Sequence, residues 1–213
     1  MYKLAIMGGT FDPIHMGHLR MAETVRQEFD FSRLVLLPAY RPPHKQRRCD
    51  FADPADRLEM VRLAVEDYPY LTVSDLEFHR RGLSYTFDTV CRLESLWPDC
   101  SFYMVIGADM VEQLPTWYKS HELLQRIHFL AVERPGYSAE KGVRMVEKAF
   151  GDWAAAKIIP APMPEMDVSS TEIRARVRKG LSIHGMVPDA VEDYIIKHRL
   201  YRACDTADFD WKR

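Results

Sequence analysis

The chain has 213 residues, which is long enough for one large α/β domain to bury its own core without disulfides or metal ions. With 47% hydrophobic and 28% charged residues, its composition is that of an ordinary globular protein, and disorder, collagen and coiled coil are excluded. The 29 basic and 31 acidic residues give a formal net charge of −2, so we do not expect binding to a nucleic-acid polymer.

The sequence carries no pattern for a membrane or for export. The longest apolar stretch, Leu34–Ala39, is far shorter than the ~20 residues of a membrane helix and contains a proline. The apolar run in Met1–Met7 is too short for a secretory signal. The four cysteines form no C-x-x-C pair, which favours reduced thiols over a zinc or redox centre. We therefore expect a cytoplasmic protein that does not bind membranes.

The first part of the chain alternates between strand and helix patterns. Lys3–Met7 and Arg33–Pro38 are continuous apolar runs, which are typical of parallel strands covered on both faces. Between them, apolar residues recur at helical spacing from His18 to Phe29, and this predicts a β-α-β unit. The next helix is expected to begin at Pro54, because proline suits a first helical turn.

The alternation continues to the end of the chain. Strands are predicted at Leu71–Ser74, Ser101–Ile106, His128–Val132 and Lys157–Ile159, and helices at Thr86–Ser95, His121–Arg126 and within Ala139–Trp153. Ser169 and Glu172 form a capping-box pattern, Gly180 is placed to end that helix, and Pro188 opens another. The pattern predicts an α/β fold with a doubly wound, mainly parallel sheet.

The domain organisation is expected to be simple. No internal repeat, low-complexity tract or linker divides the sequence. We expect a single domain over residues 1–213. Within it, we expect a C-terminal helical element at about 169–201 and a loose polar tail at 203–213.

The loop after the first strand has the sequence GGTFDPIHMGH and carries the strongest functional pattern. Ligands of open parallel sheets bind beyond the carboxyl ends of the strands, where this loop must lie. Gly8 and Gly9 let backbone amides approach a phosphate, and the following helix offers unpaired N–H groups. A single histidine is most often a structural residue, but His15 and His18 bracket a glycine at the helix start. The pair therefore favours anion binding.

Zinc is the alternative ligand for this histidine pair. Zinc usually takes three or four protein ligands, and neither a cysteine nor a third histidine stands at a supporting spacing. We therefore predict no metal ligands in the protein.

Two motifs resemble those of a known enzyme superfamily. Residues 8–19, GGTFDPIHMGHL, resemble the H-x-G-H signature of the nucleotidyltransferases, and residues 169–174, SSTEIR, resemble their S-S-T-x-I-R signature. Further blocks are similar to the bacterial nicotinate mononucleotide adenylyltransferase family: Pro42–Lys45, Ser84–Thr86, Ile106–Asp109, Pro115–Tyr118 and Arg134–Gly136. The resemblance covers about residues 1–201 and implies a Rossmann-like nucleotidyltransferase fold.

The activity that this resemblance implies is transfer of AMP from ATP to nicotinate mononucleotide. The products are nicotinate adenine dinucleotide, in NAD biosynthesis, and pyrophosphate. The attacking phosphate monoester has a second pKa of about 6, so it is already mostly a dianion and needs no protein base. Such a reaction depends on positioning two anions and on stabilising charge during direct in-line attack. A site rich in positive donors is therefore expected.

The resemblance also implies roles for individual residues. The implied catalytic residues are His15, His18, Lys45 and Arg174. ATP binding is implied for Gly8, Gly9, Thr10, Phe11, His18, Gly107, Asp109, Arg134, Ser170, Thr171 and Arg174. Binding of the mononucleotide is implied for His15, His44, Lys45, Thr86, Trp117 and Tyr118.

Within the mononucleotide site, the resemblance implies that Trp117 stacks on the nicotinate ring and that the Thr86 and Tyr118 amides receive its carboxylate. Buried tryptophans are more often core than ligand platforms, but this segment is too short to be core on periodicity grounds. Composition alone favours a solvated loop for the basic run Arg41–Arg48 and a solvated face for the arginines near Arg174. Mg²⁺ is expected with ATP, held mostly by phosphate oxygens and water.

Other functions remain open at this level. H-x-G-H alone also fits a phosphopantetheine adenylyltransferase or a cytidylyltransferase, although the Trp117 block and the Pro42–Lys45 loop favour the nicotinate enzyme. An aminoacyl-tRNA synthetase would need an anticodon-binding domain for which no residues are left. A nucleotide sensor without turnover would not need both His15 and His18. Whether the chain forms a homo-oligomer stays open.

Overall fold

The structure is a computed structural model that describes residues 2–42, 51–80, 82–133, 138–161 and 168–202. Its strands form a six-stranded parallel sheet in the order β3-β2-β1-β4-β5-β6. The strands are β1 (Tyr2–Gly9), β2 (Leu34–Pro38), β3 (Leu71–Val73), β4 (Cys100–Gly107), β5 (His128–Val132) and β6 (Ile158–Ala161). The predicted doubly wound parallel sheet is confirmed.

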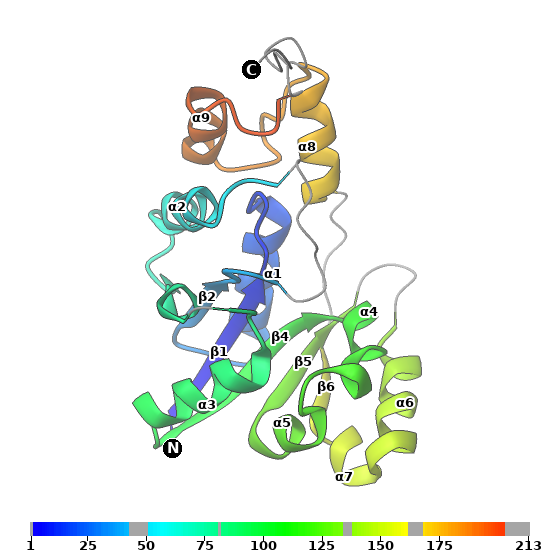
Figure 1. Cartoon of the computed structure of the whole chain (residues 1–213). Helices are drawn as coiled ribbons and strands as arrows, with labels where there is room; N and C mark the ends of the chain where they lie inside the picture. The colour runs from blue at the N-terminus through cyan, green and yellow to red at the C-terminus, as the bar shows by residue number, and fades with distance from the viewer. Residues whose placement is uncertain (1, 43–50, 81, 134–137, 162–167, 203–213) are drawn as a thin grey trace, which may run out of the picture.

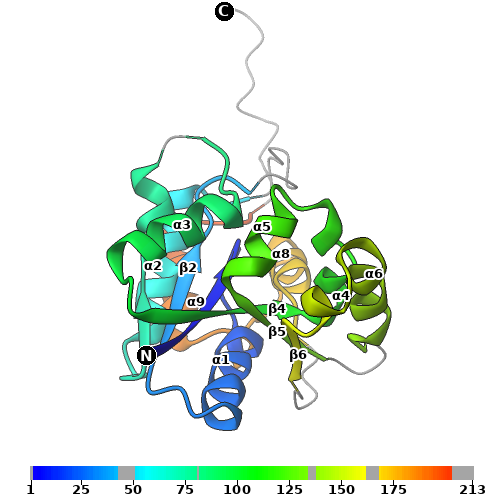
Figure 2. The ribbon, with the colours of Figure 1, turned by 90° about the horizontal axis from the view of Figure 1, so that it is seen from below.

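Helices cover both faces of this sheet (Figure 1). On one face lie α1 (Met16–Glu28), α2 (Pro54–Val65), α8 (Ser170–Arg178) and α9 (Asp189–Lys197). On the other lie α3 (Thr86–Leu96), α4 (Ala108–Val111), α5 (Ser120–Arg126), α6 (Glu140–Phe150) and α7 (Asp152–Ala155), of which α3, α5 and α6 stand in front of the sheet in Figure 2. Two 3₁₀ turns, η1 (Leu76–His79) and η2 (Leu114–Thr116), complete the described elements. Among the described residues, no helix has the length and apolar character needed to cross a membrane.

The central strand β1 shows why its sequence is apolar without alternation. Ala5 and Met7 point into the core formed with α1 and α2, whereas Ile6 points into the core on the opposite face. All three are at most 2% exposed. A strand covered on both faces needs apolar side chains at successive positions, and this requirement produces the continuous run.

The helices begin and end at the predicted capping residues. Pro54 is the first residue of α2, and the Ser169 hydroxyl accepts a hydrogen bond of 3.2 Å from the Glu172 amide at the start of α8. Gly180 follows α8 with φ +67°, a conformation in which glycine carries no steric cost. Pro188 precedes α9 as its N-cap. Each of these predictions is confirmed.

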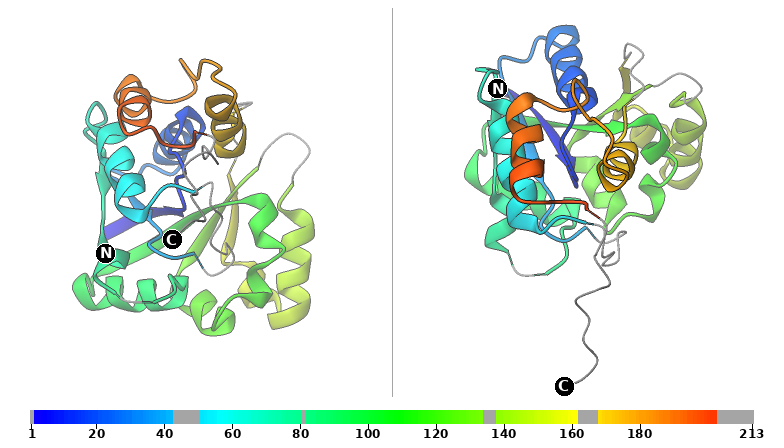
Figure 3. Two further views of the ribbon diagram at one scale, coloured as in Figure 1. Left: turned by 45° about the horizontal axis from the view of Figure 1, so that its top comes forward. Right: turned by 90° about the horizontal axis from the view of Figure 1, so that it is seen from above.

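Other elements differ from the expectation in detail. The helical stretch within 139–153 is divided at Gly151, whose φ is +91°. The short helix α4 and the two 3₁₀ turns were not predicted, because three or four residues show no helical period. In the C-terminal element, α9 packs beside α2 (Figure 3). The Tyr194 hydroxyl of α9 donates to Asp56 of α2 at 2.9 Å. The single-domain organisation stays a prediction, and 203–213 lies outside the described residues.

The position of the ligand site follows from the strand order. The chain proceeds outward from β1 through β2 to β3 and then returns to place β4 on the other side of β1. The connections that leave the carboxyl ends of β1 and β4 therefore go to opposite faces of the sheet. Crevices at such switch points are the usual ligand sites of open α/β sheets.

Gly142 marks a close contact between α6 and α4. A Cβ at this position would lie 2.7 Å from the Val111 Cβ and 2.9 Å from the Glu112 backbone nitrogen. We expect Gly142→Ala to lower the free energy of unfolding by about 1–3 kcal/mol, because overpacking exceeds the gain in helix propensity. Lys148→Ala, on the exposed side of α6, is the control. Urea unfolding measures both, and equal stability of the two variants would contradict the expected clash.

Candidate active site

The β1–α1 loop folds tightly over the carboxyl end of β1. A Cβ on Gly9 would lie 3.0 Å from the Phe11 ring, so the glycine lets this ring pack against the backbone. Phe11 is 2% exposed and has φ +48°, a conformation that L-residues seldom adopt. The loop is therefore held in one shape by packing on its inner side.

The two histidines lie face to face at the start of α1. The ring centroids of His15 and His18 are 3.7 Å apart, with 30° between the planes. A Cβ on Gly17 would lie 3.0 Å from Cε1 and Nδ1 of His15, which explains the glycine between them. Nδ1 of His18 accepts a hydrogen bond of 3.2 Å from the His15 backbone N–H. A neutral His18 must then carry its proton on Nε2, and this is the donor that the ring can offer a ligand.

Helix α8 brings the second motif to this loop. The Ser170 hydroxyl donates to the Pro13 carbonyl at 3.0 Å, and Arg174 Nη1 donates to the Asp12 carbonyl at 2.7 Å. Arg174 is 6% exposed. The first backbone N–H groups of α8 have no partner within the helix, so the N-terminus adds partial positive charge to the cationic guanidinium.

A cavity of about 240 Å³ opens where the two motifs meet. It is lined by Thr10, Phe11, Asp12, His15, His18, Val168, Ser169, Ser170, Thr171 and Arg174. The structure thus brings most predicted residues of the two signatures together, whereas Gly8 and Gly9 end β1 and are not part of this lining. Of these lining residues, Asp12 carries the one carboxylate, and the remaining polar groups include a cation, two imidazoles and hydroxyls. The arrangement suits an anion of phosphate size.

A buried network that the sequence did not reveal supports this cavity from behind. Arg57, on α2 and 3% exposed, donates to four backbone carbonyls: Thr10 at 2.7 Å, Ala39 at 2.8 Å, Tyr40 at 3.1 Å and Ala52 at 3.3 Å. Burial lowers the pKa of Arg57, while the charge of Asp12 raises it. The sequence did contain a signal for this residue. Arg57 stands four and seven residues before Val61 and Ala64 on the apolar face of its helix.

Asp12 and Tyr201 are the other members of this network that the sequence did not reveal. One carboxylate oxygen of Asp12, Oδ1, accepts from the Tyr201 hydroxyl at 2.7 Å and from the Ala52 N–H at 3.1 Å. Burial raises the pKa of Asp12, and these hydrogen bonds together with the charges of Arg174 and Arg57 oppose the increase. Asp12 lies inside the recognised loop motif, but nothing local in the sequence connects it with Tyr201.

The predicted adenosine side lies at the end of the neighbouring strand. Gly107 ends β4, beside β1, and a Cβ there would overlap Oδ1 of Asp109. Asp109 is exposed in the first turn of α4. Any larger residue at 107 would make the Asp109 side chain move from this position. Arg134, the third residue predicted for this side, lies outside the described residues.

The predicted nicotinate side is formed by two segments that meet through their aromatic rings. The rings of Tyr85 and Tyr118 have centroids 4.8 Å apart, which places the start of α3, at Thr86, beside the η2–α5 segment. Trp117 packs against the core and meets the Phe129 ring edge-on at 6.2 Å. The expectation that this segment is too short for the core was therefore wrong, because one partly buried tryptophan can pack against the core without periodicity.

The loop predicted to carry His44 and Lys45 lies outside the described residues. The described residue before it, Arg41, is held by Ser84, whose hydroxyl accepts from the Arg41 N–H at 3.2 Å and whose N–H donates to the Arg41 carbonyl at 2.9 Å. After it, Ala52 is held by Asp12 and Arg57. The described ends of this loop are thus attached to the nicotinate side and to the phosphate side.

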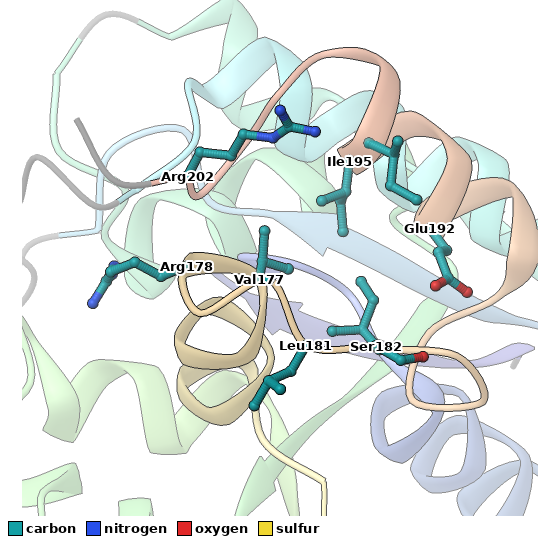
Figure 4. A pocket seen from close by; sticks show the side chains of 10 residues that line it. Val177, Arg178, Leu181, Ser182, Glu192, Ile195 and Arg202 are labelled. Carbon is teal, nitrogen blue, oxygen red and sulfur yellow. The ribbon is translucent and has the colours of Figure 1, made fainter. Parts of the chain in front are cut away.

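A larger cavity, of about 760 Å³, lies in the C-terminal element (Figure 4). It is lined by residues of α8, α9, their connection and the segment after α9, including Val177, Arg178, Leu181, Ile195 and Arg202. None of the described residues that line it was predicted for the active site. Size alone therefore does not identify the site, and the convergence of the two motifs does.

Within the described residues, one group has ligand atoms close enough to share a metal ion. His184, Asp189 and Glu192 each bring one such atom to within 4.8 Å of the others. His184 and Asp189 are exposed, and all three lie in the C-terminal element rather than in the cavity lining.

Comparisons with known proteins agree with this geometry. Residues 6–176 match the model of the cytidylyltransferase-like family. The chain is 42% identical over 201 residues to a probable nicotinate-nucleotide adenylyltransferase of Exiguobacterium sibiricum, covering 93% of this chain and 98% of the relative. It is 39% identical over 203 residues to nicotinate-nucleotide adenylyltransferase of Bacillus subtilis, covering 95% and 100%.

A solved structure supports the fold. Plasmodium falciparum nicotinic acid mononucleotide adenylyltransferase complexed with NaAD superposes with a TM-score of 0.77 at 21% identity, over 94% of this chain and 98% of that one. Similarity at this identity supports the architecture, and the two bacterial relatives carry the assignment. The chain belongs to the nicotinate-nucleotide adenylyltransferase family, within the cytidylyltransferase-like proteins.

Proposed function

We propose that this chain transfers AMP from ATP to nicotinate mononucleotide, giving nicotinate adenine dinucleotide and pyrophosphate. The observation that carries the proposal is the convergence of His15, His18, Arg174 and the α8 N-terminus on one cavity at the end of β1. Membership of the adenylyltransferase family supports the same reaction. The cavity chemistry favours binding of phosphates over covalent catalysis.

The chemical role of the cavity follows from its charges. The mononucleotide phosphate attacks the α-phosphate of ATP in line, and negative charge grows on the departing pyrophosphate. The Nε2–H of His18 donates to the reacting phosphates, while Arg174 and the first amides of α8 hold the leaving group. Such donors, fixed before the reaction, stabilise the transition state more than the bound substrates.

No protein base or nucleophile is required for this step. The nucleophile is already mostly ionised at neutral pH. The cavity carboxylate, Asp12, is engaged on its far oxygen by Tyr201 and Ala52. The Ser170 hydroxyl donates to the Pro13 carbonyl and so is not activated by a base. We infer that catalysis here is positioning plus electrostatic stabilisation.

Magnesium enters as part of the ATP substrate. Mg²⁺ prefers octahedral oxygen ligands and usually keeps several waters together with substrate phosphates. A cavity with one carboxylate, itself hydrogen bonded, fits a metal that is held by the nucleotide. The protein groups then bind phosphate oxygens that the metal leaves open.

We place the remaining predicted residues around this centre. Gly107, Asp109 and Arg134 form the adenosine side, and His44 and Lys45 reach the substrate phosphates. The nicotinate carboxylate is received by backbone amides at Thr86 and Tyr118, near the contact between the Tyr85 and Tyr118 rings. Backbone N–H donors bind an acid and reject its neutral amide, because the amide presents an NH₂ group to a donor.

A substrate comparison tests the proposed function directly. Nicotinate mononucleotide, nicotinamide mononucleotide and phosphopantetheine are each supplied with Mg-ATP, and pyrophosphate release is measured. We expect nicotinate mononucleotide to be consumed fastest, since it alone combines a pyridine ring with a carboxylate. Faster consumption of phosphopantetheine would overturn the assignment, and no turnover with any of them would favour a nucleotide sensor.

His18 is expected to act in turnover rather than in folding. His18→Ala should lower kcat by at least about a hundredfold, as loss of one fixed donor does in other enzymes. His79→Ala, whose side chain is 74% exposed on η1, is the matched control and should leave kcat unchanged. Steady-state kinetics measure kcat of both variants, and a thermal melt shows whether each is folded. A folded His18→Ala enzyme with near-normal kcat would contradict the role.

Trp117 is expected to bind the mononucleotide and to support the core. Trp117→Ala should weaken binding of nicotinate mononucleotide about tenfold while ATP binding changes little, since stacking on an aromatic side chain contributes ~1–3 kcal/mol. Trp97→Ala, at a tryptophan that is 49% exposed, is the control. Titration of each ligand measures the effect. Equal loss of both ligands would indicate that Trp117 serves only the core.

A further inference from the structure

The Asp12 carboxylate accepts its hydrogen bonds on the oxygen that does not face Arg174. Both hydrogen-bond donors to the Asp12 carboxylate, the Tyr201 hydroxyl and the Ala52 N–H, reach the same oxygen, Oδ1. The other oxygen, Oδ2, faces Arg174 Nη1 at 3.8 Å. This separation is longer than a hydrogen bond. Asp12 and Arg174 therefore attract one another without forming a close, two-point ion pair.

Arg174 is fixed instead by a neutral group. Its Nη1 donates to the backbone carbonyl of Asp12 at 2.7 Å, and its guanidinium lies over the Phe51 ring at 5.1 Å. Its Nε is buried and has no hydrogen-bond partner within the described residues. The arginine is thus oriented at the cavity wall while much of its hydrogen-bonding capacity stays available.

We propose that Tyr201 is the positioning residue that keeps Arg174 available for ATP, by binding Asp12 on Oδ1 and so preventing a close Asp12–Arg174 pair. The inference rests on the proposed function of Arg174 in phosphate binding. Without the Tyr201 hydroxyl, the nearest strong donor for the buried carboxylate is Arg174. A closer pair would then turn the guanidinium away from the cavity and neutralise its charge.

The state of Tyr201 fits this role. It is 7% exposed and has φ +59°, a conformation that L-residues seldom adopt, so its position is imposed by its surroundings. Burial, and then the charge of Asp12, raise the pKa of its hydroxyl, which therefore stays protonated and donates. Its partner, Asp12, lies 189 residues earlier in the chain, in the β1–α1 loop.

The chain offers a matched control for this hydroxyl. Tyr194 on α9 also donates to a carboxylate, Asp56 on α2, at 2.9 Å. Asp56 does not line the phosphate cavity. Tyr194→Phe thus removes a hydrogen bond of the same kind from the same C-terminal element without touching Asp12 or Arg174.

The test compares ATP with AMP in calorimetric titrations of Tyr201→Phe. We expect affinity for ATP to fall about tenfold, as for a lost hydrogen bond to a charged group, while affinity for AMP stays close to that of the unchanged protein. Tyr194→Phe should leave both affinities unchanged. The ratio of the ATP affinity to the AMP affinity does not depend on the fraction of folded protein. Lower stability of Tyr201→Phe therefore does not change the interpretation of this ratio.

A double-mutant cycle shows whether Tyr201 acts through Arg174. Arg174→Ala should weaken ATP strongly, and adding Tyr201→Phe to it should cause no further loss, because the group being positioned is already absent. Additive losses, or equal loss of ATP and AMP in Tyr201→Phe, would overturn the inference while the proposed function stands. If Arg174→Ala itself left ATP binding unchanged, the phosphate-binding role of Arg174 would be wrong and the inference with it.

Discussion

The architecture of this site depends on one buried cation. The Arg57 guanidinium accepts no hydrogen bonds and cannot lose its proton in a protein, so its N–H groups must all be paired when it is buried. It meets this requirement with carbonyls from the loops that follow β1 and β2 and from the segment before α2. Because the bonds come from one planar group, moving any of these segments would leave a buried N–H of this cation without a partner. The loops around the cavity at the end of β1 are therefore held relative to one another by a single side chain.

The same network sets the sign of charge in the cavity. The charges of two buried arginines, Arg57 and Arg174, act on Asp12, so these three side chains together carry a surplus of positive charge. The single carboxylate turns its hydrogen-bonded oxygen inward, toward Tyr201 and Ala52. The other polar side chains of the cavity lining are a guanidinium, imidazoles and hydroxyls, all of which can donate hydrogen bonds. Two mutually repelling anions can approach one another only where this surplus is present, and here it comes from groups that need no reorganisation.

A feature of the fold or of the candidate site could be predicted where the residues that determine it lie close together in the sequence. The sheet, the caps of α8 and the convergence of His15 with His18 all follow from residues close together in the sequence, and those predictions are confirmed. The hydrogen bond between Asp12 and Tyr201 joins opposite ends of the chain, and no periodicity encodes it. The sequence does not single out Arg57 for a different reason: charged residues on helices are usually solvated, and only its place on the apolar face contradicts that rule.

The long-range contacts also explain how the two halves of the phosphate site come together. Helix α8 follows the last strand of the sheet, and its described contacts with the β1–α1 loop are few and specific: Ser170 to Pro13 and Arg174 to Asp12. The connection after α8 adds the Met186 carbonyl, which accepts from the Met16 N–H at 2.9 Å, immediately after His15. Each of these bonds joins a C-terminal residue to the same short loop. Formation of the anion site and docking of the C-terminal element are therefore one event, which is why a tyrosine near the end of the chain can influence a phosphate bound beside its beginning.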